Sequence, residues 1–233
     1  MRKTILSFLL STLTMLYTSA ITADGLFSYA GLNIHYSSVN LDEFGATSLE
    51  DDSVGFSLFA ASRLYKKLYL EYGYKDLGKY TADYDFTVGS FRLVESHSAD
   101  FSTNIYTGLV LKASLADIFD GVELNSGLGK VYLHAGLGAL LWSAKLEMSG
   151  ELYDSSTLLS PYSGTGDDNG LSHYFELGMG YELNTKLILN LIFSTYFDVG
   201  RGLDLQRHDG SQEEYRGIDI DTAGLGVCYS FCG

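Results

Sequence analysis

The sequence predicts an all-β protein, an eight-stranded antiparallel up-and-down transmembrane β-barrel. Three observations support this fold class. Eight segments alternate apolar residues with small or polar ones, and each is long enough to cross a bilayer when tilted. The connections between them are long and short in turn, as in barrels of the outer membrane. The composition, with one proline, 26 glycines, 18 tyrosines and 13 phenylalanines, favours strands and tight turns over helices.

The first twenty residues read MRKTILSFLLSTLTMLYTSA, with a basic start, an apolar stretch and a small-residue exit. This layout predicts a secretory signal peptide over residues 1–20, with cleavage after Ala20 or as late as Ala23. A retained anchor is the alternative, but the apolar stretch is short for a span. We therefore expect residues 21–233 to form one outer-membrane β-barrel domain.

The charge balance restricts the partners. Removal of the leader takes away Arg2 and Lys3 and leaves 13 basic against 29 acidic residues. Nucleic acid is not an expected partner, because phosphate binding needs clustered Lys and Arg. After the leader no run of 18 apolar residues remains, so a helical span is not expected either. A barrel strand needs only about ten alternating residues to cross the bilayer.

The first four alternating segments share this pattern and lie in the first half of the chain. They read LFSYAGLNIHYS, SVGFSLFAASR, LYLEYGYKDLG and DFSTNIYTGLVLK, at residues 26–37, 53–63, 68–78 and 100–112. About fifteen polar residues separate the first two segments, and the short LYKK joins the second to the third. A longer link follows the third segment.

The last four segments repeat the rhythm. They read KVYLHAGLGALLWSAK, LSHYFELGMGYEL, LILNLIFSTYFDV and IDIDTAGLGVCYSF, at residues 130–145, 171–183, 187–199 and 218–231. Long links follow the fifth and seventh segments, and NTK joins the sixth to the seventh. The rhythm predicts periplasmic termini and four long loops at the cell surface. The link at 113–129 is long where a short turn is expected, and we expect a short helix in it near Ser114, with no assigned role.

The two faces of each segment indicate which side chains contact lipid and which fill the interior of the barrel. In the sixth segment Phe175, Leu177 and Met179 alternate with Glu176 and two glycines. A soluble barrel would turn the apolar set inward and present a glycine-rich surface of poor solubility. We therefore expect the apolar set to face lipid and the glycine-rich set to fill a narrow interior. Aromatic residues of the lipid-facing set are expected to form the interfacial girdles. They are Tyr36, Tyr72, Tyr74, Phe101, Phe193, Phe197 and Tyr229.

Charged residues on the interior set form the candidate site. They are Arg63, Glu71, Lys75, Lys112, Lys130, His134, Glu176 and Glu182. Charges in so narrow a space should be paired, so we interpret them as a polar plug of salt bridges. The alternative is a charged constriction in a narrow porin-like channel for ions or small solutes, although eight strands leave little room for a wide pore.

Other motifs carry weaker signals. Three GxG pairs lack the strand-to-helix turn of a phosphate loop. Ser172 and His173 are adjacent, so on a regular strand they point to opposite faces and cannot form a nucleophile and base pair. The acidic stretch GDDNG at 166–170 could bind divalent cations weakly, without a defined ligand spacing. We assign no catalytic residue, no cofactor and no metal site.

Two cysteines near the end of the chain are the remaining chemical candidates. Cys228 and Cys232 lie four residues apart, about 13 Å along an extended strand, which is too far for a disulfide unless the end of the strand frays. We expect an interior thiol at Cys228 and an exposed periplasmic one at Cys232, with no assigned role for either.

The tail GLGVCYSF resembles the C-terminal assembly signal of bacterial outer-membrane barrels, through Gly226, Tyr229 and Phe231. The stretches LYLEYGYKDLGKY and VYLHAGLGALLW resemble strands of the eight-stranded OmpA-type transmembrane domain. The resemblance covers nearly the whole chain after the leader. It implies a monomer in the outer membrane of a Gram-negative bacterium that contacts membrane lipid, lipopolysaccharide and the barrel-assembly machinery, and it leaves a surface ligand unnamed. Fold alone does not fix function, and we expect a structural or surface-recognition role through the four long loops.

Overall fold

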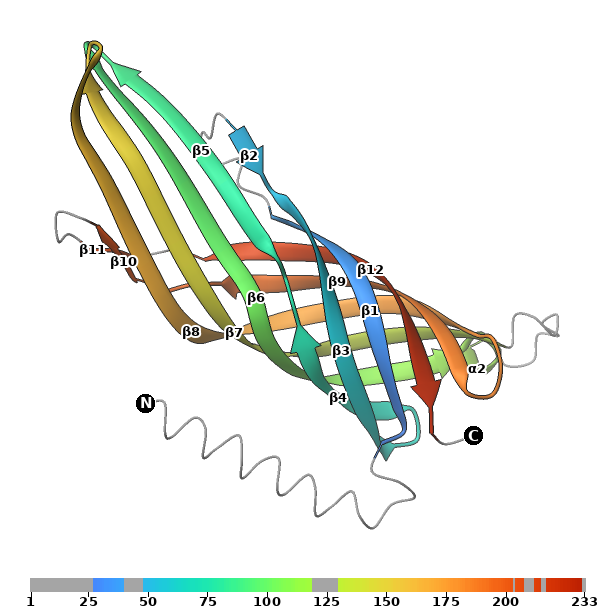
Figure 1. Ribbon diagram of the computed structural model, residues 1–233. Coiled ribbons are helices and arrows are strands. Elements are labelled where there is room, and N and C mark those ends of the chain that lie inside the picture. The colour runs from blue at the N-terminus through green and yellow to red at the C-terminus, as the bar shows by residue number, and fades with distance from the viewer. Residues whose placement is uncertain are drawn as a thin grey trace.

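The computed structural model describes residues 27–39, 48–118, 130–202, 204–207, 212–214 and 217–231. The expected leader and Cys232 lie outside these residues. Eight antiparallel strands form a closed ring (Figure 1). They are β1 (Tyr29–Val39), β3 (Asp52–Tyr65), β4 (Leu68–Lys75), β6 (Phe91–Ser114), β7 (Val131–Asp154), β8 (Thr157–Glu182), β9 (Leu187–Val199) and β12 (Ile218–Ser230). Each contains one of the eight predicted segments in whole or in large part, so the predicted barrel is confirmed.

The ring closes because the first strand pairs with the last. On one edge β1 pairs with β3, and on the other it pairs with β12 from Tyr29 opposite Ser230 to Val39 opposite Ile220. We call the end of the barrel at Tyr29 and Ser230 the terminal end. The tight β3–β4 and β8–β9 connections lie there, as does α2 (Leu115–Ile118), which confirms the short helix expected near Ser114. The rest of that link, 119–129, lies outside the described residues.

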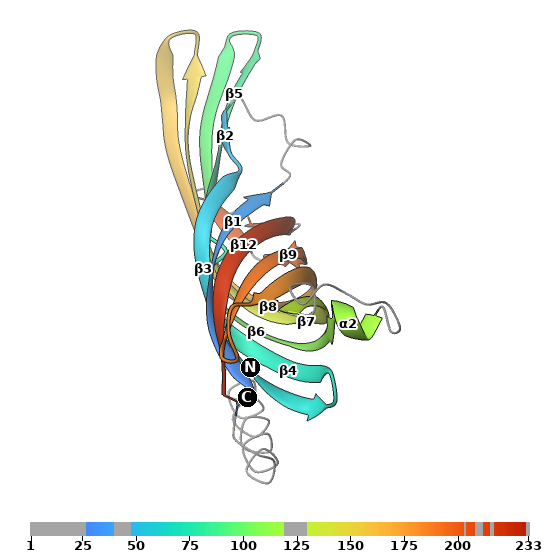
Figure 2. The same cartoon turned by 90° about the vertical axis from the view of Figure 1, so that its right-hand side faces the viewer.

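Four strands continue far beyond the opposite end of the barrel. They form a sheet, which we call the flap, from β5 (Lys79–Val88) and residues 91–100, 145–154 and 157–167 of β6, β7 and β8. Figures 1 and 2 show it as two long hairpins, side by side, rising from one side of the barrel. The links after the third and fifth segments were predicted to be loops, and that prediction is wrong. Both links alternate like strands, as Tyr84, Phe86 and Val88 do in β5.

Short turns and small strands complete the flap. Two-residue turns close both hairpins, with Gly89 at φ 65° in one and Ser155 at φ 57° in the other. Positive φ at the first turn position matches the twist of a tight hairpin. The remaining strands are β2 (Ser48–Glu50), which pairs with β5, β10 (Asp204–Arg207), which pairs with β8, and β11 (Gln212–Glu214), which pairs with β10.

The burial of alternate side chains confirms the assignment of the two faces. Phe175, Leu177 and Met179 are exposed on the outer wall, whereas Tyr174 and Glu176 are buried inside. Strands β1, β7 and β12 follow the same rule. An apolar outer wall with a polar interior is the pattern of a barrel whose solvent is lipid. Among the described residues, no helix is long and apolar enough to span a membrane.

One aromatic residue departs from the predicted girdle. Phe101 was expected on the lipid-facing wall, but it is fully buried. The reason is a β-bulge: Asp100 pairs with Lys145 and Thr103 with Ser143, so two residues of β6 face one residue of β7. A bulge inserts one residue and reverses the alternation, which turns the Phe101 ring into the interior.

A charge on the outer wall tests this assignment. Leu137 lies in the middle of the barrel portion of β7 and is 64% exposed. An arginine near the bilayer midplane of a barrel costs about 2 to 4 kcal/mol, so Leu137→Arg should lower the free energy of unfolding by that amount. Urea unfolding in lipid vesicles measures the change. Leu137→Met keeps the wall apolar and should unfold like the parent, and an equal loss in both variants would contradict a lipid-facing Leu137.

Candidate functional site

The buried carboxylate of Glu71, on β4, lies at the centre of the polar interior. Its Oε2 accepts a hydrogen bond from the Tyr29 hydroxyl at 3.0 Å, and its Oε1 accepts one from the Tyr106 hydroxyl at 3.1 Å. The two tyrosines come from β1 and β6, on either side of the β3–β4 hairpin. The carboxylate therefore links side chains of three strands across the lumen.

A second buried carboxylate, Glu176 on β8, extends the network. It accepts a hydrogen bond from Ser194 at 3.2 Å, and its Oε1 lies 3.4 Å from His134 Nε2. Lys75, also buried, donates a hydrogen bond to the Tyr196 hydroxyl, and its Nζ lies 4.7 Å from the centroid of that ring. Ammonium groups over aromatic faces are attracted by the ring quadrupole, so the tyrosine provides part of the charge compensation for Lys75.

The structure brings five of the eight predicted network residues together and leaves three outside. Lys112 joins the network with its Nζ 3.3 Å from the centroid of the Tyr29 ring. Arg63 is exposed at the terminal end, and its guanidinium lies 5.7 Å from the Tyr69 ring centroid. Glu182 is half-buried and accepts a hydrogen bond from Tyr132 at 3.4 Å. Lys130 is exposed, immediately before β7 begins, so it does not reach the interior.

Tyrosines connect the interior charges where salt bridges were expected. Within the described part of the chain, His134 and Glu176 form the interior ion pair within 4 Å, and the lysines contact aromatic rings. The residues missed from the sequence are Tyr29, Tyr69, Tyr106, Tyr174, Tyr196 and Ser194. Their signal was their place on the interior set of their segments.

Glycines provide the space that these rings occupy. A Cβ built on Gly108 would lie 2.3 Å from the Tyr174 hydroxyl, and one on Gly138 would lie 2.7 Å from Tyr174 Cε1. The Tyr174 ring packs edge-on against Tyr106, with 5.8 Å between centroids. The small residues on the interior face therefore allow large aromatic side chains to cross a narrow barrel.

A second, apolar cluster fills the barrel next to the flap. Phe101, Leu140, Trp142 and Tyr80 are each at most 3% exposed, and they pack with Leu77, Tyr196, Val199 and Ile220. The Tyr80 hydroxyl donates a hydrogen bond to the Leu77 carbonyl at 2.5 Å. Polar and apolar clusters thus follow one another along the axis of the barrel.

The other chemical candidates lie apart. Ser172 is buried and donates to the Asp198 carbonyl at 3.1 Å, whereas His173 is exposed and stacks on Phe197, so the two point to opposite faces as predicted. Residues 166–170 were read as a loop but belong to β8. Cys228 is buried and accepts a hydrogen bond from Asn190 at 2.7 Å. In the part of the chain that the structure describes, no three acidic, His or Cys side chains gather as a metal site.

The predicted assembly signal forms the terminal end of β12. Tyr229 and Phe231 are exposed on the outer wall, with ring centroids 5.3 Å apart. A Cβ on Gly226 would meet the Asn33 side chain at 1.6 Å, so this position holds glycine for contact with β1. The Phe231 amide donates to the Ser28 carbonyl at 3.0 Å, and the Nζ of Lys186 lies 5.7 Å from the centroid of the Tyr229 ring.

The predicted assembly signal can be tested separately from the interior of the barrel. Phe231→Ala removes the terminal aromatic ring of the signal without changing the interior, so we expect it to reduce the amount of folded protein in the outer membrane. Cys232→Ala, one residue later, should have a smaller effect. Heat-modifiable gel mobility of membrane fractions measures both, and equal yields for the two variants would contradict a signal centred on Phe231.

The flap has one apolar and one polar face. Its apolar face is buried near the barrel, at residues such as Met148, and open at the tip. We call five exposed or half-buried apolar residues that β5 and β6 place on this face the tip patch; they are Tyr84, Phe86, Val88, Phe91 and Leu93. Phe86, Val88 and Phe91 are 43%, 77% and 50% exposed. On the polar face Arg92 donates two hydrogen bonds to Asp85, at 3.0 and 2.6 Å, and these lower the pKa of the Asp85 carboxyl.

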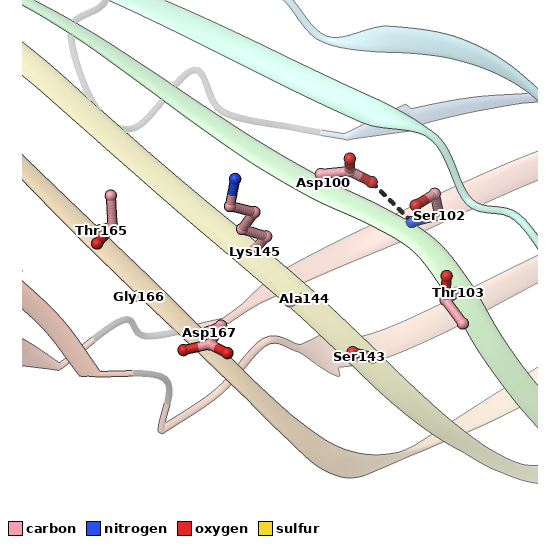
Figure 3. Close-up of a pocket in the computed structure, with 9 residues that line it drawn as sticks. All are labelled: Asp100, Ser102, Thr103, Ser143, Ala144, Lys145, Thr165, Gly166 and Asp167. Atoms are coloured by element: carbon pink, nitrogen blue, oxygen red, sulfur yellow. Dashed lines mark hydrogen bonds between the residues drawn. The ribbon is translucent and has the colours of Figure 1, made fainter.

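A shallow recess of about 390 Å³ lies where the flap leaves the barrel (Figure 3). Figure 3 shows Asp100 on β6, Lys145 on β7 and Asp167 on β8 around it, with Ser102 and Thr103 at the bulge. The Ser102 amide donates to Asp100 at 2.9 Å, and Lys145 donates to Glu147. The recess therefore offers hydroxyls and two carboxylates, and one of these carboxylates, that of Asp100, is held by a hydrogen bond from the Ser102 amide.

Comparison with known proteins places the whole barrel in one group. A family model described as the OmpA-like transmembrane domain matches residues 27–233. Similar solved structures include Neisserial surface protein A (11% identity, 87% of this chain and 96% of that chain covered, TM-score 0.45). The attachment invasion locus protein Ail of Yersinia pestis (13%, 88% and 99%, 0.40) and OprG from Pseudomonas aeruginosa (12%, 88% and 95%, 0.40) are also similar. No curated protein matches the chain.

Proposed function

The chain belongs to the OmpA-like transmembrane domain family and lies in the outer membrane of a Gram-negative bacterium, and from this premise we propose that it is a surface-recognition protein. The barrel is the anchor, the terminal end faces the periplasm and the flap extends outside the cell. This orientation follows the rule that periplasmic turns are short and extracellular connections long. The protein acts as a monomer and without catalysis.

The exposed tip patch carries this proposal. Soluble monomeric proteins rarely expose large contiguous apolar patches, and such patches mark interaction sites. Here Phe86 packs beside Tyr84, with 5.8 Å between ring centroids, at the far end of a sheet that projects beyond the barrel. An apolar surface held away from the membrane is suited to a partner on another cell, in serum or on a phage.

The filled interior favours an anchor over a channel. The Glu71 network and the apolar cluster around Phe101 and Leu140 occupy successive levels of the barrel. Eight strands leave an interior just wide enough for side chains. A narrow porin-like channel is the alternative function, and it needs these side chains to move aside.

The binding experiment compares the two faces of the flap. Phe86 and Phe91 are replaced together by serine in the tip patch, and Val94→Ser, on the opposite face of β6, is the matched control. Bacteria displaying each variant are tested for adherence to cultured cells and for retention of serum proteins. We expect the double variant to lose binding and the control to keep it, at equal surface levels of folded barrel.

Conductance of the refolded parent protein in planar bilayers tests the lumen directly. We expect the parent protein to pass almost no current. Steady parent currents, together with equal binding by the two serine variants, would contradict recognition by the tip patch and support the channel.

A further inference from the structure

The outer wall of the barrel has a groove on the side away from the flap strands β5 to β7. It has a volume of about 330 Å³ and crosses β8, β9, β12 and β1. Two rows of paired residues line it. The lower row is Leu177, Phe193, Ala223 and Tyr36, and the upper row is Phe175, Thr195, Asp221 and Ser38.

The groove lies across the border between the apolar wall and the polar end. Below it on β12, toward the terminal end, Leu225 and Val227 are exposed and apolar. Asp221 lies in its upper row, and the next outward position of the same strand above the groove is Asp219. Because the flap end faces outside the cell in the proposed orientation, this border belongs to the outer leaflet.

A small residue makes the groove hollow. Ala223 lies between Phe193 on β9 and Tyr36 on β1, which are 52% and 48% exposed. The bulky side chains stand on both sides, and the alanine leaves the space between them empty. The apolar lower part is continuous with the lipid-facing wall, so an acyl chain is the ligand that reaches it directly.

The upper part of the groove is polar and carries a fixed acceptor. Thr195 donates a hydrogen bond of 2.6 Å to Asp221 Oδ1, which holds the carboxylate at the edge of the groove. Tyr36 donates in the same way to Asp52, at 2.7 Å. Among the described residues that line the groove none is basic, so a phosphate there would meet a carboxylate without a counter-charge. Sugar hydroxyls, which donate hydrogen bonds, complement this edge.

We propose that this groove is a specific site for a sugar-headed lipid of the outer leaflet, with one acyl chain over Ala223 and sugar hydroxyls hydrogen-bonded to Asp221. The site uses the orientation of the barrel but none of the tip patch. It gives the protein a preferred lipid neighbour on one side of the barrel, in addition to the general contact of the wall with the bilayer.

The test titrates the folded, detergent-solubilised protein with dephosphorylated lipid A, which keeps the sugars and acyl chains but lacks the phosphates, and records bound lipid by native mass spectrometry. Ala223→Trp fills the groove, and Ala139→Trp makes the same change on the lipid-facing wall of β7, outside the groove. We expect Ala223→Trp to weaken binding of dephosphorylated lipid A about tenfold, as loss of contact with about two methylene groups predicts. Ala139→Trp should bind like the parent.

A second variant separates headgroup from chain. Asp221→Asn retains the shape of the carboxylate but not its charge, and it should reduce the preference for dephosphorylated lipid A over chain-matched phosphatidylethanolamine and phosphatidylglycerol. Equal effects of the two tryptophan variants, or a parent protein that prefers either phospholipid, would overturn the proposal. A parent dimer abolished by Ala223→Trp would assign the groove to a second copy of the chain. Gel mobility verifies that each variant is folded, and the flap binding assay should be unaffected.

Discussion

Replacing Glu71 by alanine is expected to lower the free energy of unfolding by about 3 to 5 kcal/mol, the cost of breaking a buried charge network by removing one partner. The carboxylate is 6% exposed and accepts hydrogen bonds from two tyrosines of other strands. Its loss leaves both hydroxyls without their acceptor and removes one of the two carboxylates, Glu71 and Glu176, that act on Lys112. Urea unfolding in vesicles, followed by the fluorescence of the single tryptophan, Trp142, measures the change.

Lys130→Ala is the matched control, because it removes a charge predicted for the same network but exposed in the structure. It should unfold within error of the parent. The Glu71 variant should also show brief conductance steps in planar bilayers that the control lacks. Equal stability of the two variants would show that the network does not hold the strands together.

Gly138→Ala is expected to destabilise the barrel through crowding. The added Cβ would lie 2.2 Å from the Thr107 carbonyl oxygen and 2.6 Å from the Cα of Gly108, so backbone of β6 would have to move. Overpacking of this kind costs about 1 to 3 kcal/mol, and more where the backbone cannot adjust. We expect slow or incomplete refolding into vesicles, measured by gel mobility.

Gly136→Ala provides the comparison two residues away on the same face of the same strand. Its Cβ would meet Val110 Cγ2 at 3.2 Å, a side-chain contact that a small shift relieves. This variant should refold nearly as well as the parent. A similar loss in both would attribute the effect to general strand preferences rather than to the close approach of β6 at Gly138.

The barrel could be predicted because the signal for a strand is local. Alternation along 187–199 predicts β9 with both of its ends, and the apolar set of 171–183 predicts which side chains of β8 face outward. The flap was missed although β5 alternates as clearly. The long polar links were assigned to loops because long and short connections alternate in outer-membrane barrels. That expectation was given more weight than the alternation of apolar and polar residues within the links.

The site was predicted only in part because it depends on register. Alternation assigns Glu71 and Glu176 to the interior, but it does not show which tyrosines lie opposite them on other strands. The bulge that turns Phe101 inward leaves no local mark in the sequence. Lys130 was assigned by extending the alternation one residue beyond the strand, where the rule no longer applies.

The pairing of β1 with β12 means that the barrel closes only when its last strand has arrived. Tyr29 meets Ser230, so contacts that seal the barrel join residues from opposite ends of the chain. Long-range contacts of this kind slow folding, because the entropy of closing a long loop is lost before the paired strands contribute any stabilising free energy. Until the last strand arrives, the growing sheet has two unpaired edges, which bare hydrocarbon does not tolerate. A chain that loses β12 therefore has no partly inserted resting state, and we expect it to be degraded rather than stored in the membrane.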